Sequence, residues 1–526
     1  MQRLASIFAP LLVTLNATTA MAATYYVASG GNNGDVGSSS NPWQTLQHAA
    51  DAVAPGDTVI VRSGTYAGFY LSTSGSSGTP ITFSAEPGVV INQVNPRTAD
   101  GINLEGASYV VIEGFTITEV TRAGIRAVTC NHVTIRNNRA DQNGRWGILT
   151  GFCDDLLIEG NECSRSVAEH GIYVSNSGDR PVIRGNRSWG NNANGIHMNG
   201  DVTLGGDGII SGALVENNII HGNGAAGGSG INCDGVQDST IRNNLLYDNH
   251  ASGISLYKID GGDGSKRNVV VNNTILVAAD GRWALNIQGA SADNIALNNI
   301  LLNLNPSRGS IDVSADSFPI TSDYNVVMDR FSNGGTFVTL SAWRSATSQD
   351  TNSFTATAAE LFVNPSADDY HLKSMSPAVD RGTQTQAPPT DLEGLTRPAG
   401  AGIDIGAFEL GGTQAGDAGS NNGGATGSGG TANIGGAMGS GGASGTGGAP
   451  NTGGAADGGP AGGRTAAGGA TSGTPDASAG TSTSNEKGSC SCRVVDRRVQ
   501  SLGFHILALG FALLFCRRAR RRGGNS

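Results

Sequence analysis

A group of polar and aromatic side chains recurs at two fixed distances from a repeated Gly-Ile pair. With the Gly counted as position 0, position 2 holds Tyr173, His197, Asn232 and Ser255, and position 4 holds Asn199, Asp234 and Tyr257. Aromatic rings offer apolar surfaces, and amide, carboxylate and hydroxyl groups offer hydrogen bonds, which is the mixture that a carbohydrate site needs. The alternative interpretation is a solvated sheet face that binds no ligand.

The spacing of the Gly-Ile pairs indicates the elements that must position these side chains. The pairs begin at residues 101, 124, 147, 171, 195, 230 and 253, so the gaps are 23, 23, 24, 24, 35 and 23 residues. A second marker is an Asn after each short Val-, Ile- and Thr-rich run, at Asn138, Asn161, Asn186, Asn218, Asn244, Asn273 and Asn299. Such a period indicates a solenoid, and the short alternating runs indicate strands rather than helices. The sequence therefore predicts an all-β fold, a right-handed parallel β-helix.

Stacking of such coils turns equivalent positions into columns. Strands of successive coils lie about 4.8 Å apart, so the Ile column fills the interior while positions 2 and 4 face outward on one face. The chain between coils loops out after Gly195 and Gly253, and insertions of this kind often lie at a binding face. Cys130 and Cys153 share position 6 of adjacent coils, which predicts either a disulfide or two stacked interior thiols.

A family resemblance adds to this reading. Residues 24–327 resemble the parallel β-helix repeats of the pectate-lyase-like superfamily. The start, YYVASGGNNGDVGSSSNPWQTLQHAADAVAPGDTVIVRSGTY, resembles the N-terminal cap of its secreted members, and implies a short capping helix from Trp43 to Ala54 followed by a strand over Thr58–Arg62. Residues 376–410 (SPAVDRGTQTQAPPTDLEGLTRPAGAGIDIGAFEL) resemble the closing segment of β-helix proteins that precede varied anchors.

The resemblance also implies candidate chemistry. Polysaccharide lyases of this superfamily act on uronate sugars by β-elimination, which needs a base and a cation that stabilises the developing charge. His197 or Lys258 is then the candidate base, and Arg126 the candidate partner of a substrate carboxylate. Ca²⁺ prefers oxygen ligands, and its candidate ligands are Asp201, Asp207, Asp234 and Asp238. His170, at a turn, is predicted to be a structural or hydrogen-bonding residue.

The two ends of the chain are expected to lie outside the fold. Residues 1–22 have the basic start, apolar run and Ala-x-Ala site of a secretory signal peptide. Residues 411–487 are nearly all small or polar and predict a disordered linker. Residues 488–526 contain a Cys motif, an apolar run from Val499 to Cys516 and an Arg cluster, which predict a transmembrane helix with a basic cytoplasmic end. This tail resembles the MYXO-CTERM surface-sorting signal, so we expect a secreted protein anchored at the bacterial cell envelope.

Between these ends, we expect the β-helix with its cap at 23–328 and a β-rich closing segment at 329–410. The formal net charge of −10 argues against nucleic acid as a partner. The expected partners are a polysaccharide and, through the tail, the membrane; the protein is expected to be a monomer. Three functions fit the sequence: a carbohydrate-active enzyme, a non-catalytic adhesin or carbohydrate-binding protein, and a purely structural envelope protein.

Overall fold

The computed structural model of this protein describes residues 22–414. Residues 1–21 of the predicted signal peptide, nearly all of the predicted linker, and the predicted anchor at 488–526 lie outside these residues. No helix between residues 22 and 414 is long and apolar enough to span a bilayer.

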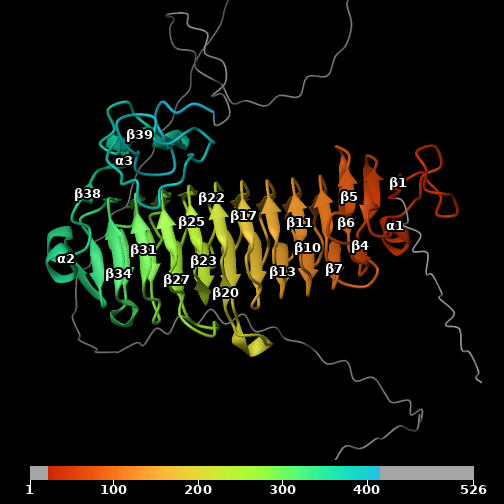
Figure 1. The fold of residues 1–526 in the computed structure, drawn as a ribbon, viewed down its shortest axis with the longest axis horizontal. Helices are drawn as coiled ribbons and strands as arrows, with labels where there is room; N and C mark the ends of the chain where they lie inside the picture. The colour runs from red at the N-terminus through yellow and green to blue at the C-terminus, as the bar shows by residue number, and fades with distance from the viewer. Residues whose placement is uncertain (1–21, 415–526) are drawn as a thin grey trace, which may run out of the picture. The chain divides into compact units, whose positions relative to one another are not determined.

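The described residues form a right-handed parallel β-solenoid of about 11 turns, which confirms the predicted fold (Figure 1). Each turn contributes one strand to each of three parallel sheets, named A, B and C here. Strands of sheet A are, in order, β1 (Thr24–Val27), β2 (Thr58–Val61), β5 (Ile81–Ala85), β8 (Val110–Glu113), β11 (Val133–Arg136), β14 (Leu157–Glu159), β17 (Val182–Arg184), β21 (Leu214–Glu216), β25 (Thr240–Arg242), β28 (Val269–Val271), β31 (Asn294–Leu297) and β34 (Ile320–Asp323).

Sheets B and C complete each turn. Strands of sheet B are β3 (Gly64–Ala67), β6 (Val89–Gln93), β9 (Thr116–Thr118), β12 (Arg139–Asp141), β15 (Glu162–Ser164), β18 (Arg187–Trp189), β22 (Ile219–His221), β26 (Leu245–Tyr247), β29 (Thr274–Val277), β32 (Ile300–Asn303), β35 (Val326–Val327) and β38 (Phe354–Thr355). Strands of sheet C are β4 (Phe69–Leu71), β7 (Ile102–Glu105), β10 (Ala123–Val128), β13 (Trp146–Gly151), β16 (Ile172–Ser175), β19 (Ile196–Asn199), β23 (Ser229–Asp234), β27 (Ser252–Tyr257), β30 (Leu285–Ile287), β33 (Ile311–Val313), β36 (Phe331–Asn333) and the antiparallel β37 (Thr336–Val338).

Two sequence markers become the two internal columns that hold the turns together. The Ile residues of the Gly-Ile pairs are in register between neighbouring strands of sheet C, and all are fully buried. The Asn markers form a hydrogen-bonded ladder. In each step the backbone N–H and Nδ2 of one Asn donate to Oδ1 of the next, as from Asn186 to Asn218 at 2.9 and 3.0 Å. The ladder matters because buried polar groups are costly unless they are paired.

Helices and a folded segment close the two ends. Helix α1 (Leu46–Ala52) begins after Thr45, whose side chain accepts the His48 N–H, so it is shorter than the predicted range from Trp43 to Ala54. Helix α2 (Leu340–Thr347) buries Trp343 fully against Phe331, with ring centroids 5.1 Å apart. The rest of the predicted closing segment contains helix α3 (Ala358–Leu361), the 3₁₀ turn η3 (Pro365–Ala367) and the antiparallel pair β39 (Phe362–Asn364) and β40 (Asp369–Leu372). Its apolar side chains pack on the outer surface of sheet B.

Four short elements lie in the connections from sheet C to sheet A. They are the 3₁₀ turns η1 (Val202–Leu204) and η2 (Ala315–Ser317), and the parallel pair of β20 (Ile210–Ser211) with β24 (Val236–Gln237). The predicted looping out after Gly195 and Gly253 is found as residues 201–209, which contain η1, and residues 258–264. We call these two segments the wall loops.

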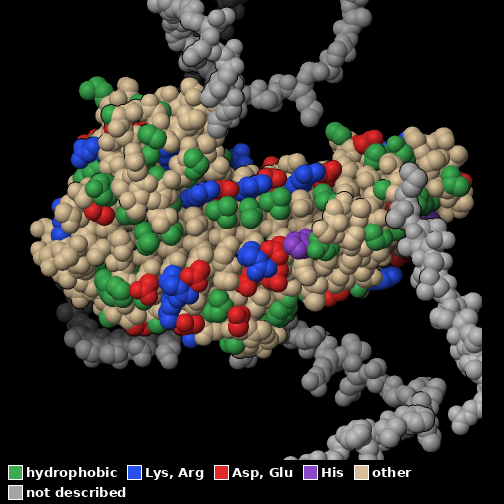
Figure 2. Space-filling model, viewed as in Figure 1, with side chains coloured by type: hydrophobic (Ala, Val, Ile, Leu, Met, Phe, Trp, Pro, Cys, Tyr) green, Lys and Arg blue, Asp and Glu red, His purple; other side chains and the backbone are tan. Residues whose placement is uncertain are grey.

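The outer surface of sheet A carries a row of alternating acids and bases. Register places these residues on six adjacent strands: Glu113, Arg136, Glu159, Arg184, Glu216 and Arg242. Arg184 Nε lies 2.6 Å from Glu159 Oε1. Figure 2 shows this row running beside a row of hydrophobic side chains. A single exposed ion pair contributes little to stability. We therefore interpret the row chiefly as an alternation of opposite charges that favours this register between the strands of sheet A.

Candidate functional site

The strand register of sheet C places the predicted side chains in two neighbouring columns. Tyr173, His197, Asn232 and Ser255 are aligned in one column, and Ser175, Asn199, Asp234 and Tyr257 in the next. This alignment was predicted from the repeat. We call the outward side of β13, β16, β19, β23 and β27 the sheet C face. Its side chains are more buried than an open face would leave them, since Tyr173 is 8% and His197 6% exposed.

A stack of three rings lies at the centre of the sheet C face. The ring centroids of Tyr173 and His197 are 4.9 Å apart at an angle of 16°, and those of Trp146 and Tyr173 are 6.0 Å apart at 29°. We call these three residues the ring stack. Trp146 stands just before a repeat Gly, so the count of positions 2 and 4 did not include it. Its side chain joins Tyr173, Ala123 and Leu149 in a cluster separate from the interior.

Two buried histidines form a hydrogen-bonded pair whose proton positions can be assigned. The backbone N–H of Asn194 donates to His170 Nδ1 over 3.2 Å, so this nitrogen is an acceptor. A neutral His170 then carries its proton on Nε2 and donates to His197 Nδ1 over 3.1 Å. His197 consequently carries its proton on Nε2, a buried atom with no hydrogen-bond partner among the described residues. The bonding role predicted for His170 is confirmed by these contacts.

Burial keeps both imidazoles uncharged. It lowers the pKa of His197 to about 3. Burial, with further effects of His197 and Arg145, also lowers the pKa of His170 well below its usual value. At neutral pH His197 is therefore a neutral ring that presents an N–H. This arrangement suits a donor to a ligand oxygen and does not suit the base that the sequence suggested, because a base must present a free lone pair.

A charged pair flanks the ring stack on the side of β13. Arg145 Nε donates to Glu169 Oε1 over 3.0 Å, and the guanidinium carbon lies 4.3 Å from the centre of the Trp146 ring. The other carboxylate oxygen, Glu169 Oε2, is buried without a hydrogen bond and lies 3.7 Å from His170 Nε2. The charge of Arg145 is thus matched by Glu169, and both side chains hold the ring stack in place.

Asp234 anchors the wall loops on the opposite side. Its Oδ1 accepts the backbone N–H groups of Ile259 and Gly261, and its Oδ2 accepts that of Asp260, over 2.8 to 3.0 Å. The two wall loops are joined by a bond from Val202 N–H to the Asp260 carbonyl, 3.0 Å, and by one from Gly262 N–H to the Gly208 carbonyl, 2.8 Å. Asp234 is 1% exposed, so its carboxylate serves this anchor. Burial raises its pKa, and the three donors act in the opposite direction.

Asn199 connects the ring stack to the wall loops. Its Nδ2 donates to the Tyr173 hydroxyl over 3.2 Å, and its side chain also hydrogen-bonds the Asp260 carboxylate. Asn199 Oδ1 is buried and has no partner in the described part of the chain. Burial raises the pKa of Asp260, and the nearby charge of Asp201 adds to this rise. Two buried atoms next to Tyr173 therefore have no partner among the described residues: a donor, His197 Nε2, and an acceptor, Asn199 Oδ1.

Other predicted binding residues lie further along the sheet C face. Asn232 Nδ2 donates to the Tyr257 hydroxyl over 2.9 Å, and the hydroxyls of Ser255 and Ser229 are 2.9 Å apart. Burial raises the pKa of Tyr257 well above its usual value, so it stays protonated. These residues continue the ring stack as a neutral, hydrogen-bonding surface.

The two predicted cationic residues lie away from the ring stack. Arg126 is two strands from Tyr173 in the same column; it donates to Asn103 Oδ1 over 3.0 Å and forms an ion pair with Glu105. Lys258 is exposed on a wall loop, and its Nζ donates to the Gly262 carbonyl over 3.1 Å. The structure therefore does not gather Arg126, Lys258 and His197 at one point.

The four predicted calcium ligands are likewise separated in role. Asp201 Oδ1 accepts the Thr203 N–H, Asp207 Oδ1 accepts the Ile209 N–H, and Asp238 pairs with Arg267 at 2.7 Å. Asp234 is occupied by the loop anchor described above. Across residues 22–414, no group of three or more His, Cys, Asp or Glu side chains is placed to hold a metal ion. Calcium binding stays a prediction.

The predicted disulfide between Cys130 and Cys153 is not formed, because both cysteines are free thiols. The two residues do stack, with the Cys130 N–H 3.3 Å from Cys153 Sγ. Each thiol lies near backbone carbonyls of its own and the preceding turn, as Cys153 does at 3.2 Å from the Gly151 oxygen and 3.3 Å from the Ala127 oxygen. The alternative prediction of stacked interior thiols therefore describes the structure.

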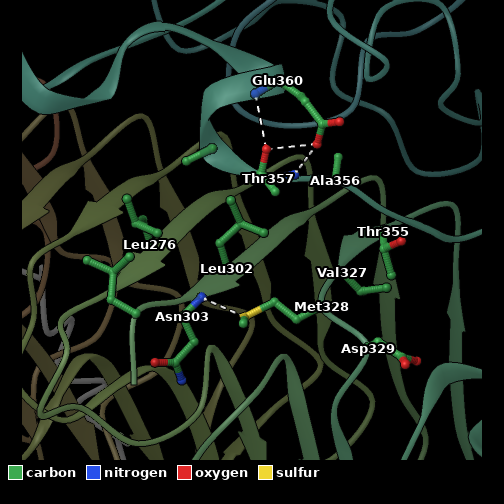
Figure 3. A pocket seen from close by; sticks show the side chains of 12 residues that line it. Leu276, Leu302, Asn303, Val327, Met328, Asp329, Thr355, Ala356, Thr357 and Glu360 are labelled. Atoms are coloured by element: carbon green, nitrogen blue, oxygen red, sulfur yellow. Dashed lines mark hydrogen bonds between the residues drawn. The ribbon is translucent and has the colours of Figure 1, made fainter. Parts of the chain in front are cut away.

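A separate cavity of about 490 Å³ lies between sheet B and the closing segment. Leu276, Leu302 and Met328 line it, and the Glu360 carboxylate at its rim is bonded to Thr357 in a helix cap (Figure 3). Its polar groups serve local structure, whereas the sheet C face has unused buried donors and acceptors. We therefore take the sheet C face as the candidate site.

The buried histidine pair predicts that stability falls with acidity. The pKa of His197 is about 3 when folded and about 6.5 in an unfolded chain, so the unfolded state binds more protons between these values. Stability is then complete above about pH 6.5 and declines by a few kcal/mol toward pH 3. The free energy of unfolding is measured with urea at about pH 7 and about pH 5. Its decrease between the two pH values should be smaller in a His170→Gln/His197→Gln variant than in the wild type, and in the control His48→Gln it should equal that of the wild type. An equal loss in the double variant would contradict this.

Known proteins resemble this chain over the solenoid. Residues 25–281 match the family described as Pel9A-like, right handed beta helix region. Among solved structures, pectate lyase Pel9A matches with a TM-score of 0.50 and 18% identity, covering 74% of this chain and 96% of that one. Alginate lyase from Paenibacillus sp. str. FPU-7 matches with a TM-score of 0.43 and 23% identity over 55% of this chain and 97% of that one. At 18% identity the likeness to pectate lyase Pel9A describes the fold alone.

One curated protein also matches in sequence. The Bacillus subtilis (strain 168) protein YwoF, described as uncharacterized, is 27% identical over 202 residues, which is 33% of this chain and 43% of that protein. The match thus spans less than half the length of that relative.

Proposed function

We propose that this protein binds a polysaccharide chain along the sheet C face, with the ring stack as its platform. The observation that carries the proposal is the ring stack bordered by His197 Nε2 and Asn199 Oδ1, a donor and an acceptor that are buried and unused. Buried polar atoms without partners are costly, so a ligand that supplies partners gains affinity once the face adjusts to admit it. Sugar rings supply both apolar faces and hydroxyl groups.

The repeat itself suits a linear polymer. Tyr173 and His197 occupy equivalent positions of successive turns, and Trp146 of the preceding turn stacks on Tyr173, so the three rings form a row along the stacking direction. Asn232, Ser255 and Tyr257 extend this row on the following turns. An extended ligand would meet similar chemistry at each step, as expected for solenoid binding surfaces.

The test is binding of the purified full-length protein to a panel of soluble polysaccharides in affinity gel electrophoresis. Retardation by at least one polysaccharide, with isothermal titration giving its Kd, is the expected result. Failure to bind every member of a panel that spans neutral and uronate polymers would contradict the proposal.

Cleavage by β-elimination is a second function to be tested in the same samples. Lys258 is the remaining candidate for the base, because its amine is exposed on the wall loop formed by residues 258–264. Elimination would create a carbon–carbon double bond in the product, which is followed by ultraviolet absorbance with and without Ca²⁺. Binding without such a product would select the non-catalytic adhesin.

Display at the cell envelope completes the proposal and rests on the sequence of the two ends. Export by residues 1–22 and retention by residues 488–526 would place the solenoid outside the cell. Protease treatment of intact cells is expected to remove the solenoid; full protection from protease would contradict display at the outer surface.

A further inference from the structure

The cationic side chain beside the ring stack is already matched by a carboxylate. Arg145 is bonded to Glu169 through Nε and Nη2 and lies over the Trp146 ring, so its charge is matched and its face is occupied. Arg126, two strands away, is matched by Glu105 in the same manner. A carboxylate on a ligand would have to compete with these existing partners to use either guanidinium.

The histidines add no positive charge to the site. His170 and His197 are bonded to each other through one shared proton, and His170 also accepts the Asn194 N–H. Protonation of either ring would place a second proton where only one fits between the two nitrogens, or would break the bond to Asn194. The pair is thus built as a neutral donor.

The wall loops carry more unpaired carboxylates than unpaired cations. Asp260 is bonded to the Asn199 amide, and Asp201 lies close enough for its charge to act on Asp260. Within residues 22–414, no ion pair includes Asp201, Asp207 or Asp260. Lys258 is the one wall-loop cation; its Nζ is exposed, is bonded to the Gly262 carbonyl and forms no ion pair among the described residues. The remaining groups that line the row, Asn199, Asn232, Ser255 and Tyr257, are neutral.

From this balance we propose that the polymer recognised on the sheet C face is built from uncharged sugars rather than uronates. The inference rests on the proposed function and narrows its ligand class. Each sugar of a uronate polymer carries a carboxylate, so a bound chain would bring further negative charge to wall loops whose unpaired carboxylates already outnumber the one unpaired ammonium, that of Lys258. A neutral sugar keeps the ring contact and the hydrogen bonds without this repulsion.

Matched polymers give the test. Polygalacturonate and alginate are compared with their carboxyl-reduced forms, which keep the linkages but lose the charge, by isothermal titration with the full-length protein at low salt. The expected result is binding to a reduced form at least about tenfold tighter than to its parent. Asp260→Asn should reduce the difference in Kd between the parent and the reduced polymer. Asp35 is an exposed residue of the N-terminal region, and Asp35→Asn should leave that difference unchanged.

The outcomes separate the two proposals. Equal or tighter binding to the uronate forms, weakened by added salt, would overturn this inference while leaving polysaccharide binding in place. Binding to neither form, nor to neutral polysaccharides tested alongside, would overturn both.

Discussion

Replacing Tyr173 with alanine is expected to weaken polysaccharide binding about 10- to 100-fold, because an aromatic side chain buried against a ligand contributes about 1.5–3 kcal/mol. Tyr173 is the middle ring of the stack, so its removal separates Trp146 from His197. It also removes the hydroxyl that positions Asn199. Isothermal titration with the polysaccharide bound most tightly by the wild type measures the loss.

Two further variants make this prediction specific. Tyr173→Phe keeps the ring and loses only the bond to Asn199, so its affinity should lie between those of the wild type and the alanine variant. Tyr109→Ala is the matched control, because Tyr109 also stacks on a histidine, His132, with centroids 4.7 Å apart, but at a turn between sheets C and A. An alanine variant at Tyr173 that folds normally and binds like the wild type would remove the ring stack from the site.

The largest expected effect on stability is that of Asn218→Ala, which should lower the free energy of unfolding by about 2–5 kcal/mol. Asn218 is fully buried in the Asn ladder. Its Nδ2 donates to the Ile183 carbonyl and to Asn244 Oδ1, both at 2.9 Å, and its Oδ1 receives the N–H and Nδ2 of Asn186. The alanine variant leaves the Ile183 carbonyl and the Asn186 N–H buried without their partners.

Urea unfolding monitored by circular dichroism measures this change. The control is Asn92→Ala, an exposed Asn on β6 of the same solenoid, for which we expect a change within about 0.5 kcal/mol. Similar small effects at both positions would mean that the ladder is not what holds consecutive turns together.

The repeat was sufficient to predict the solenoid, because its two markers are local and periodic. An Ile after each Gly and an Asn after each short strand can all be buried and paired when the turns stack in register, and the structure has this arrangement. The same counting placed Tyr173, His197 and Asn199 together. Periodicity therefore determined which residues share a face.

What the repeat did not predict depends on departures from it. Trp146 lies just before Gly147, at a position that the count did not include, and packs with Tyr173 in a cluster separate from the interior. Asp234 was taken for a calcium ligand, but its partners are backbone groups 25 to 27 residues later, in an insertion whose path no local pattern specifies. The closing segment packs on sheet B through contacts more than 130 residues apart, such as Asn272 Nδ2 with the Gly406 carbonyl.

The chemical roles of single residues were harder still to predict from the sequence, because they depend on the positions of protons. The direction of donation from His170 to His197 follows from one backbone N–H, that of Asn194. Sequence alone gives no access to that contact. It makes His197 a neutral donor, whereas composition alone suggested a base.

The central claim is that the polysaccharide lies on the ring stack, and ¹⁹F NMR of the protein labelled with 5-fluorotryptophan tests it most directly. The five tryptophans give five resonances, assigned with Trp→Phe variants. A saturating polysaccharide is predicted to shift the Trp146 resonance and to leave that of Trp343, fully buried at the C-terminal end of the solenoid, in place. A shift confined to Trp189, on the outer surface of sheet B, would contradict the account.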